Sequence, residues 1–177
     1  MPTHLLDKNV ARRIVEGLTH PDRLADEEAV ALALWRALQG LGNRMFISLE
    51  TANIMGRFSA WREIRLFLDT VETMYASRYF RRWARRLQEH GFTREDAKVL
   101  GLATYGTDAV SQMLGVEVVV TFDQSFINNY QRQRHALERR LRFMTAQLPV
   151  PFREAGLPEV IQPIEALLLF GRGLRVH

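Results

Sequence analysis

Short apolar runs alternate along the chain with longer stretches in which apolar positions recur every three or four residues. The short runs predict strands at residues 3–7, 45–48, 70–73, 115–121 and 160–161. The longer stretches have the spacing of amphipathic helices and predict helices through residues 10–18, 30–38, 49–64, 78–90, 93–113, 128–147 and 164–168. Strands and helices therefore follow one another along most of the chain.

This alternation is typical of an α/β protein with a mostly parallel sheet. Residues 116–120 are nearly all β-branched and apolar, as expected of a central strand that is covered on both faces. No repeat, low-complexity tract or glycine-serine linker divides the sequence, so we expect a single domain over residues 1–177. We predict a three-layer α/β/α fold around a short central sheet.

The composition narrows the chemistry that the chain can perform. It has no cysteine, which excludes a disulfide scaffold, cysteine-ligated zinc, iron–sulfur centres and thiol catalysis. Its formal charge of +4 favours a polyanionic partner only weakly, and of its 24 basic residues only Lys8 and Lys98 are lysine. No apolar run approaches the ~20 residues of a membrane-spanning helix, so we expect a cytoplasmic protein with no membrane partner.

Three aspartates fall where an α/β sheet gathers its ligands. Asp7 and Asp123 end two of the predicted strands, and Asp96 lies in the first turn of a helix that Thr93 is expected to cap. Ligands of an open parallel sheet bind beyond the carboxyl ends of its strands, so the three carboxylates converge if those two strands are neighbours. Clustered carboxylates repel one another unless a hard cation joins them, and oxygen ligands favour Mg²⁺ or Mn²⁺.

The order and spacing of four motifs resemble those of the PIN domain family. The motifs are Leu5-Leu6-Asp7-Lys8-Asn9-Val10, Glu95-Asp96-Ala97-Lys98-Val99-Leu100, Thr121-Phe122-Asp123-Gln124-Ser125-Phe126 and Val160-Ile161-Gln162-Pro163. The resemblance covers about residues 3–126 and 153–169. It implies an endoribonuclease that uses Mg²⁺ or Mn²⁺ to hydrolyse RNA phosphodiester bonds. Such proteins are often toxins of toxin–antitoxin pairs and often dimers, so the implied partners are RNA, an antitoxin protein and a second copy of the chain.

The resemblance also implies roles for individual side chains. Asp7, Asp96 and Asp123 match acids that bind the metal ion and carry catalysis in the family. Asn9 and Thr121 match supporting positions beside the first and the last of these acids. No histidine or lysine general base is required when a metal ion activates the attacking water.

One acid of the family pattern has no direct match. Its expected place, on the helix after the second strand, falls on Asn53 or Ile54, and neither side chain is acidic. Glu50 lies one turn earlier on nearly the same helix face and is the candidate replacement in catalysis. Either Glu50 or Asn53 completes the site in this interpretation, although a glutamate in a first helical turn is equally typical of charge complementing the helix dipole.

Two helices carry arginine-rich faces. The second of them is a helical insertion over about residues 127–152, where the family usually has only a short connection. The arginines expected to contact RNA phosphates are Arg78, Arg81, Arg82, Arg85, Arg139 and Arg142. An ordinary solvated helix face is the alternative interpretation. Phe143 lies among the arginines of the insertion, where an exposed aromatic ring would stack on a base or meet a partner subunit.

Two further classes of function are alternatives to the ribonuclease interpretation. The missing acid leaves open a PIN-like module that binds RNA or protein without cleaving it. Phosphoryl transfer on another α/β scaffold fits less well, because haloacid dehalogenase-like phosphatases need an Asp where Asn9 stands. Receiver domains need a lysine after the last strand, and Lys8 and Lys98 do not provide it. Phosphate-binding loops, serine-hydrolase elbows and zinc-protease motifs are absent from the sequence.

Overall fold

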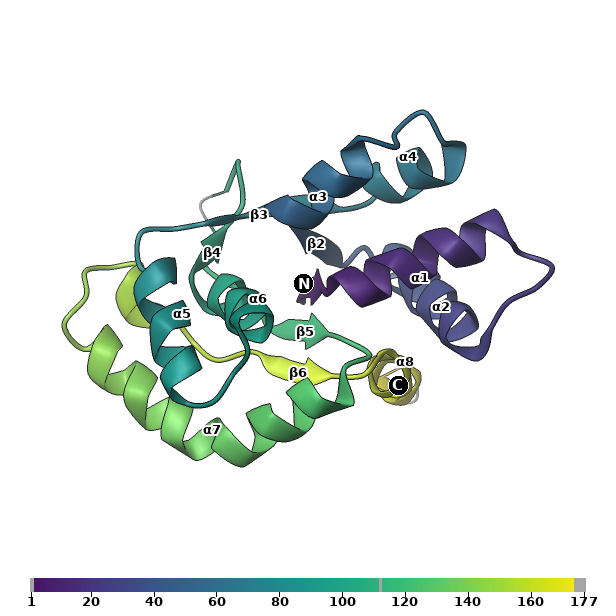
Figure 1. Cartoon of the computed structure of the whole chain (residues 1–177). Helices are drawn as coiled ribbons and strands as arrows, with labels where there is room; N and C mark the ends of the chain where they lie inside the picture. The colour runs from purple at the N-terminus through teal and green to yellow at the C-terminus, as the bar shows by residue number, and fades with distance from the viewer. Residues whose placement is uncertain (1, 112, 174–177) are drawn as a thin grey trace.

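A six-stranded sheet with the strand order β4-β3-β2-β1-β5-β6 forms the centre of the molecule (Figure 1). The computed structural model describes residues 2–111 and 113–173. Five strands run parallel to one another, namely β1 (Thr3–Leu6), β2 (Arg44–Ser48), β3 (Glu72–Ala76), β5 (Val118–Val120) and β6 (Glu159–Ile161). The short β4 (Gly106–Thr107) pairs antiparallel to β3. The predicted α/β class with a mostly parallel sheet is confirmed.

Eight α-helices and one 3-10 helix surround the sheet in the described part of the chain. The α-helices are α1 (Lys8–Thr19), α2 (Asp26–Gly40), α3 (Leu49–Gly56), α4 (Arg62–Leu68), α5 (Phe80–Glu89), α6 (Arg94–Tyr105), α7 (Gln124–Thr145) and α8 (Pro163–Gly173). The 3-10 helix η1 covers Phe152–Glu154. None of the helices in residues 2–111 and 113–173 has the length and apolar character needed to cross a membrane.

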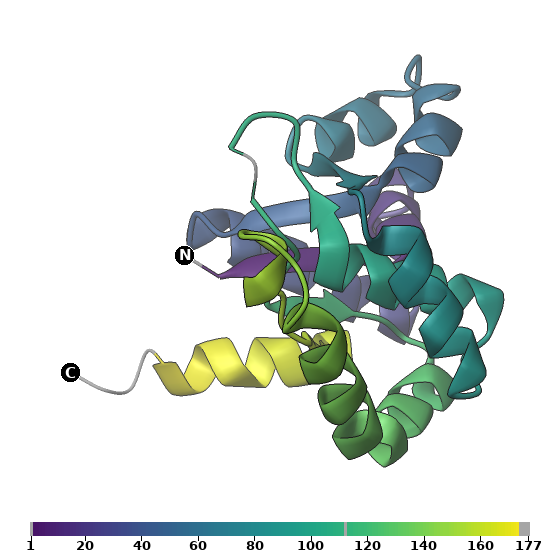
Figure 2. The ribbon, with the colours of Figure 1, turned by 90° about the vertical axis from the view of Figure 1, so that its left-hand side faces the viewer.

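Alternating side chains along the strands build a separate core on each face of the sheet. Leu5 and Phe46 point to one face, where they pack with α5, α6 and α7, whereas Leu6 and Ile47 point to the other, where they pack with α1 and α2. Figure 1 shows these two groups of helices on opposite sides of the strands, and Figure 2 turns the α5 and α7 side toward the viewer. The predicted three-layer arrangement is confirmed.

Several boundaries differ from those that the sequence pattern predicts. The expected helix over residues 49–64 is two helices, because α3 ends at Gly56 and the chain turns before α4 begins at Arg62. The third strand lies at Glu72–Ala76 rather than residues 70–73, and only Val118–Val120 of the expected 115–121 strand is paired. The helix expected from residue 128 already begins at Gln124 and ends at Thr145.

Gly106 explains why the helix expected over residues 93–113 stops at Tyr105. Its backbone is extended, it pairs with β3, and a side chain there would collide with the side chain of Met74. The chain then returns through Gly115, whose φ of 66° suits glycine and whose N–H donates to the Gly106 carbonyl over 2.8 Å. Apolar spacing alone does not reveal such a tight approach, so the pattern continued the helix too far.

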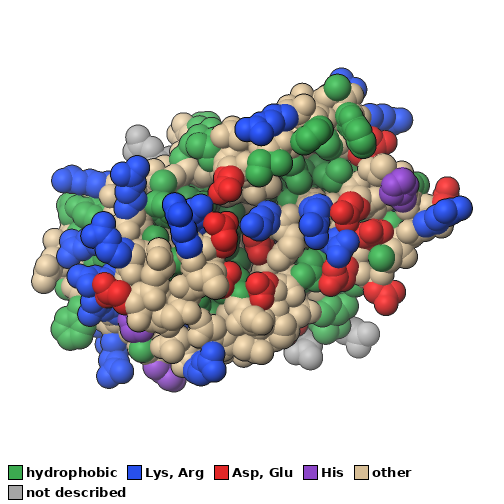
Figure 3. All heavy atoms as spheres, in the orientation of Figure 1, with side chains coloured by type: hydrophobic (Ala, Val, Ile, Leu, Met, Phe, Trp, Pro, Cys, Tyr) green, Lys and Arg blue, Asp and Glu red, His purple; other side chains and the backbone are tan. Residues whose placement is uncertain are grey.

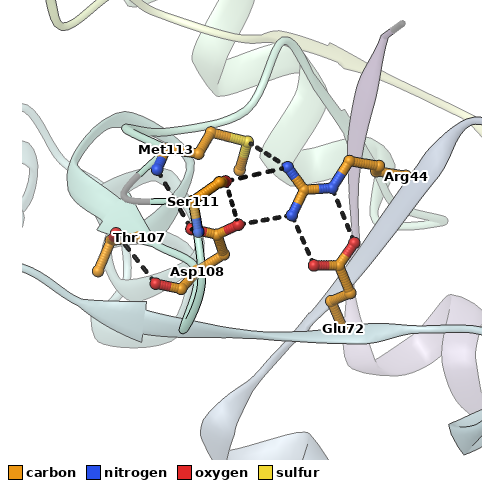
Figure 4. Close-up of polar contacts among 6 residues, drawn as sticks. All are labelled: Arg44, Glu72, Thr107, Asp108, Ser111 and Met113. Carbon is orange, nitrogen blue, oxygen red and sulfur yellow. Dashed lines mark hydrogen bonds and ion pairs between the residues drawn. The ribbon is translucent and has the colours of Figure 1, made fainter.

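Arg44 secures the edge of the sheet at which the strands begin (Figure 4). Its guanidinium donates to both carboxylate oxygens of Glu72, over 2.8 and 2.6 Å, and to Asp108 over 2.5 Å. The buried Asp108 also accepts hydrogen bonds from the backbone N–H groups of Ser111 and Met113, over 3.1 and 3.2 Å. Burial alone would raise the pKa of Asp108, but these donors outweigh it and lower the pKa to about 2. The network therefore ties the loop after β4 to β2 and β3.

We expect Asp108→Asn to lower the free energy of unfolding by about 2 kcal/mol at pH 7, since each pKa unit corresponds to about 1.4 kcal/mol. The pKa of Asp108 falls on folding from 3.8 to about 2. Its contribution is therefore fully present above about pH 4 and is lost as the pH falls through the folded value. Urea unfolding at pH 7 and pH 3 measures the difference between the two proteins. Asp69→Asn removes an exposed carboxylate and is the matched control; equal unfolding midpoints for Asp108→Asn and this control would contradict the assignment.

Candidate functional site

The carboxyl ends of β1 and β5 lie side by side at the point where the strand order reverses. Leu6 is the register partner of Val120, and the backbone N–H of Asp7 donates to the Val120 carbonyl over 3.0 Å. From β1 the chain continues to β2 on one side, whereas β5 and β6 lie on the other. This topological switch is where open parallel sheets bind their ligands.

Asp7 is held by donors from both strand ends. Its Oδ1 accepts from the Lys8 backbone N–H over 2.7 Å at the start of α1. Its Oδ2 accepts from the Thr121 hydroxyl over 2.8 Å and from the Asn9 side-chain amide over 3.1 Å. The Asn9 Oδ1 in turn accepts from the Phe122 backbone N–H over 3.2 Å. Asn9 and Thr121, predicted as supporting residues, therefore fix the orientation of the Asp7 carboxylate.

Asp123 and Asp96 reach the same place from the starts of two helices. Asp123 is exposed and caps α7, where its Oδ1 accepts from the Phe126 N–H over 3.0 Å. Asp96 is half-buried in the first turn of α6, and Thr93 caps that helix by accepting from the Asp96 N–H over 3.1 Å. Both helices thus begin at the carboxyl-end edge of the sheet and turn their first residues toward Asp7.

One pocket of about 570 Å³ is lined by Asp7, Glu50, Asp96 and Asp123. Apolar side chains also line it, among them Phe80 of α5. The volume lies within the range of small-molecule and cofactor sites. Figure 3 looks onto this side of the molecule and shows acidic side chains gathered near its middle. The structure therefore brings together all four acids that the sequence analysis selected.

The three aspartates oppose one another electrostatically. Burial raises the pKa of Asp7, and the charge of Asp123 adds to the increase. The pKa of Asp96 is also raised by burial, and by the charges of Asp123 and Asp7. Within the described residues, no Lys or Arg side chain forms an ion pair with any of the three. The pocket thus holds clustered negative charge that a bound cation would offset.

Both lysines of the chain line this pocket, a feature that the sequence analysis missed. Lys98 pairs with Glu95 over 3.3 Å and with Glu50 over 3.6 Å. Lys8 pairs with Glu95 over 3.5 Å, so ion pairs join α1, α3 and α6 around the pocket. The signal was available, because Lys8 directly follows Asp7 and Lys98 follows Asp96 by two residues in a chain whose other basic residues are arginines.

The two candidates for the unmatched acid are separated by the structure. Glu50 lines the pocket from the first turn of α3, although it is exposed and is paired with Lys98. Asn53 is exposed and is not among the residues that line the pocket. Thr121 is buried and does not line the pocket; its hydroxyl donates to Asp7 and accepts from the Asn9 side-chain amide and from the Asp123 backbone N–H.

The donor chemistry of the pocket fits a hard divalent cation. Its acidic donors are carboxylate oxygens, which Mg²⁺ and Mn²⁺ prefer. No three His, Cys, Asp or Glu side chains in residues 2–111 and 113–173 lie close enough together to hold a metal ion by themselves. Mg²⁺ commonly keeps several waters and takes only one or two carboxylates directly, so a hydrated ion among these acids is consistent with the wider spacing.

The arginines selected from the sequence are all exposed to solvent. Arg78, Arg81, Arg82 and Arg85 are exposed, whereas Trp83 and Leu87 of the same segment are buried in the core. Arg139 and Arg142 are exposed on α7, which an ion pair of Arg140 with Glu89 joins to α5 over 3.4 Å. Figure 3 shows basic side chains crowded on the side of this face where α5 and the end of α7 lie. The predicted solvent-facing arginine faces are present beside the acidic pocket.

Comparison with known proteins gives no relative from which a role could be transferred: no model of a protein family, no curated protein and no solved structure matches the chain. The site therefore has to be interpreted from its own residues.

We expect Asp7→Asn to raise the melting temperature of the metal-free protein at pH 7. Folding raises the pKa of Asp7, so ionisation is less favourable in the folded state and the carboxylate lowers stability as the pH rises above 3.8 through the folded value. Asparagine caps a helix as well as aspartate does. Its one side-chain oxygen can accept either from the Lys8 N–H or from Thr121 and Asn9, but not from all three, so the lost hydrogen bond offsets part of the gain. Differential scanning fluorimetry between pH 4 and pH 7 measures the gain, which should shrink toward pH 4. An unchanged or lower melting temperature at pH 7, against the exposed control Asp22→Asn, would mean that Asp7 is not electrostatically strained.

Proposed function

We propose that this chain is an endoribonuclease of the PIN type that depends on Mg²⁺ or Mn²⁺ and hydrolyses RNA phosphodiester bonds. The observation that carries the proposal is the convergence of Asp7, Asp96 and Asp123 in one pocket at the switch point of the sheet, where none of the three forms an ion pair with a described Lys or Arg side chain. The resemblance of the surrounding motifs to the PIN family supports the choice of reaction. Toxin–antitoxin pairing and homodimer formation are implied by the same resemblance.

In this proposal Asp7, Asp96 and Asp123 hold the metal ion, with Glu50 at the edge of the site. A bound divalent cation would supply an activated water and would stabilise negative charge on the scissile phosphate. The protein's own contribution is orientation, because Thr121 and Asn9 leave the Asp7 carboxylate little rotational freedom.

The charge around the pocket supports a polyanionic substrate. The exposed arginines of α5 and α7 flank the acids, and arginine contacts to phosphates supply affinity without sequence readout. Lys98 lies at the rim, with its ammonium shared between Glu50 and Glu95. An incoming phosphate can displace either carboxylate and pair with this ammonium, which places Lys98 beside the scissile bond. Such binding should weaken steeply with salt concentration.

A second candidate function is a PIN-like module that binds RNA without cleaving it. The observation in its favour is that Glu50, the only acidic candidate for the unmatched position, is paired with Lys98. No group of three potential ligands in the described part of the chain is close enough to hold a metal ion. In this second candidate the exposed arginines still bind RNA, but no metal ion is bound.

We expect the wild-type chain to cleave a 5′-labelled pool of random-sequence, single-stranded RNA when Mn²⁺ is present and to lose this activity in EDTA. Asp7→Asn and Asp96→Asn should each lower the rate about 100-fold or more, because each removes a charge that stabilises the reacting centre. Asp22→Asn is the control for the loss of one exposed carboxylate. RNA that is bound but stays intact with wild-type protein and Mn²⁺ would favour the second candidate. Cleavage that survives both substitutions would place the active site elsewhere.

A further inference from the structure

A second hollow, of about 220 Å³, lies between α5 and α7, away from the acids. It is lined by Arg82, Arg86, Arg140, Phe143, Met144 and Gln147. Three guanidinium groups and one aromatic ring therefore surround a space formed by two helices that are far apart in the sequence. The two helices that form it, α5 and the end of α7, lie on the crowded basic side of the molecule in Figure 3.

Phe143 is the unusual member of this set. It is 77% exposed, whereas Leu137, Leu141 and Met144 of the same helix are buried in the core. The apolar stripe that holds α7 against the protein is thus complete without Phe143, and folding gains little from its ring. A large ring that is solvent-exposed beside several cations is a feature of a binding surface rather than of a core.

The charge of the hollow is positive and only partly offset. Arg86 and Arg140 both pair with Glu89, over 3.2 and 3.4 Å, so one carboxylate serves two guanidinium groups. Arg82 forms no ion pair with any described residue. Guanidinium groups bind phosphates through paired donors and also stack on aromatic faces. The hollow therefore combines donors for a phosphate with a flat apolar surface for a base.

We propose that this hollow binds one nucleotide of a single-stranded RNA, with the base stacked on Phe143 and the phosphate contacted by Arg82, Arg86 and Arg140. Stacking on an aromatic ring combined with a basic track is the way in which proteins hold single strands without reading their sequence. A double helix offers phosphates but no free base face, so the site should prefer single strands.

The position of the hollow extends the proposed function, on which this step rests. Phe80, in the first turn of α5, lines the acidic pocket, and Arg82 and Arg86 lie farther along the same helix. At a rise of 1.5 Å per residue, Arg86 is about 9 Å beyond Phe80 along the helix axis. The hollow and the acidic pocket are thus built on the same helix, and in this proposal the hollow is a subsite that holds a strand whose other nucleotides reach the carboxylates.

The test is the affinity of the full chain for a fluorescently labelled 12-nucleotide oligouridylate, measured by anisotropy in EDTA so that no metal-dependent cleavage takes place. We expect Phe143→Ala to weaken binding about 5- to 50-fold, which corresponds to the loss of one stacked base. Phe143→Trp should retain the wild-type affinity. Phe58→Ala is the matched control, because Phe58 is 51% exposed in the turn after α3, which lies apart from the arginines of α5 and α7 (Figure 1). Affinity for a blunt RNA duplex should be the same in wild type and Phe143→Ala.

Three results would overturn the proposal. The first is equal oligouridylate affinity in Phe143→Ala and Phe58→Ala. The second is a loss of duplex affinity in Phe143→Ala that equals its loss of oligouridylate affinity, because the hollow would then contact phosphates without stacking on a base. The third is a wild-type dimer, seen by light scattering, that dissociates on Phe143→Ala, which would make Phe143 a contact to a second copy of the chain. The two proposals can fail separately. If the chain binds RNA through Phe143 but never cleaves it, the subsite is supported and the proposed nuclease activity is contradicted. If the chain cleaves RNA but its affinity does not depend on Phe143, the nuclease activity is supported and the subsite is contradicted.

Discussion

The parallel pairing of β1 with β5 is the constraint on which the candidate site depends. It places the Asp7 N–H on the Val120 carbonyl and the Asp7 carboxylate on the Thr121 hydroxyl, so two segments more than a hundred residues apart share one polar network. The helices α1 and α7 start directly after these two strands, and Asp7 and Asp123 cap them. The pairing of β1 with β5 therefore brings two capped helix starts, and with them Asp7 and Asp123, to the same end of the sheet.

The pKa values of carboxylates at the two ends of the strands are shifted in opposite directions. Asp108, where the strands begin, is surrounded by donors that outweigh its burial and lower its pKa to about 2. Asp7 and Asp96, where the strands end, have raised pKa values because burial and neighbouring aspartates dominate. The donors around Asp108 stabilise the folded chain without a ligand, whereas the charges of Asp7 and Asp96 lower its stability unless a cation or a proton binds. Unneutralised charge of this second kind is typical of functional sites.

Much of this site was predictable because its signals are local. Asp7 and Asp123 directly follow apolar runs, Asp96 follows the capping residue Thr93, and the rule for ligands at a parallel sheet then places them together. The ion pair between Glu50 and Lys98 was not predictable, because it depends on how α3 and α6 approach each other across the pocket. The end of α6 was missed for a related reason: Gly106 is needed for its close contact with Met74, which no periodic pattern records.

The central claim is that the pocket shared by Asp7, Asp96 and Asp123 binds a divalent cation, and titration calorimetry with Mn²⁺ tests it without any knowledge of the RNA substrate. The account predicts one site of micromolar affinity in the wild-type chain and its loss in Asp7→Asn, with Asp22→Asn unchanged. Binding should also weaken as the pH falls, and at a higher pH than for ordinary aspartates, because the raised pKa values of Asp7 and Asp96 let protons compete with the metal ion. Absence of Mn²⁺ binding in the wild type, or binding that survives Asp7→Asn, would contradict the account.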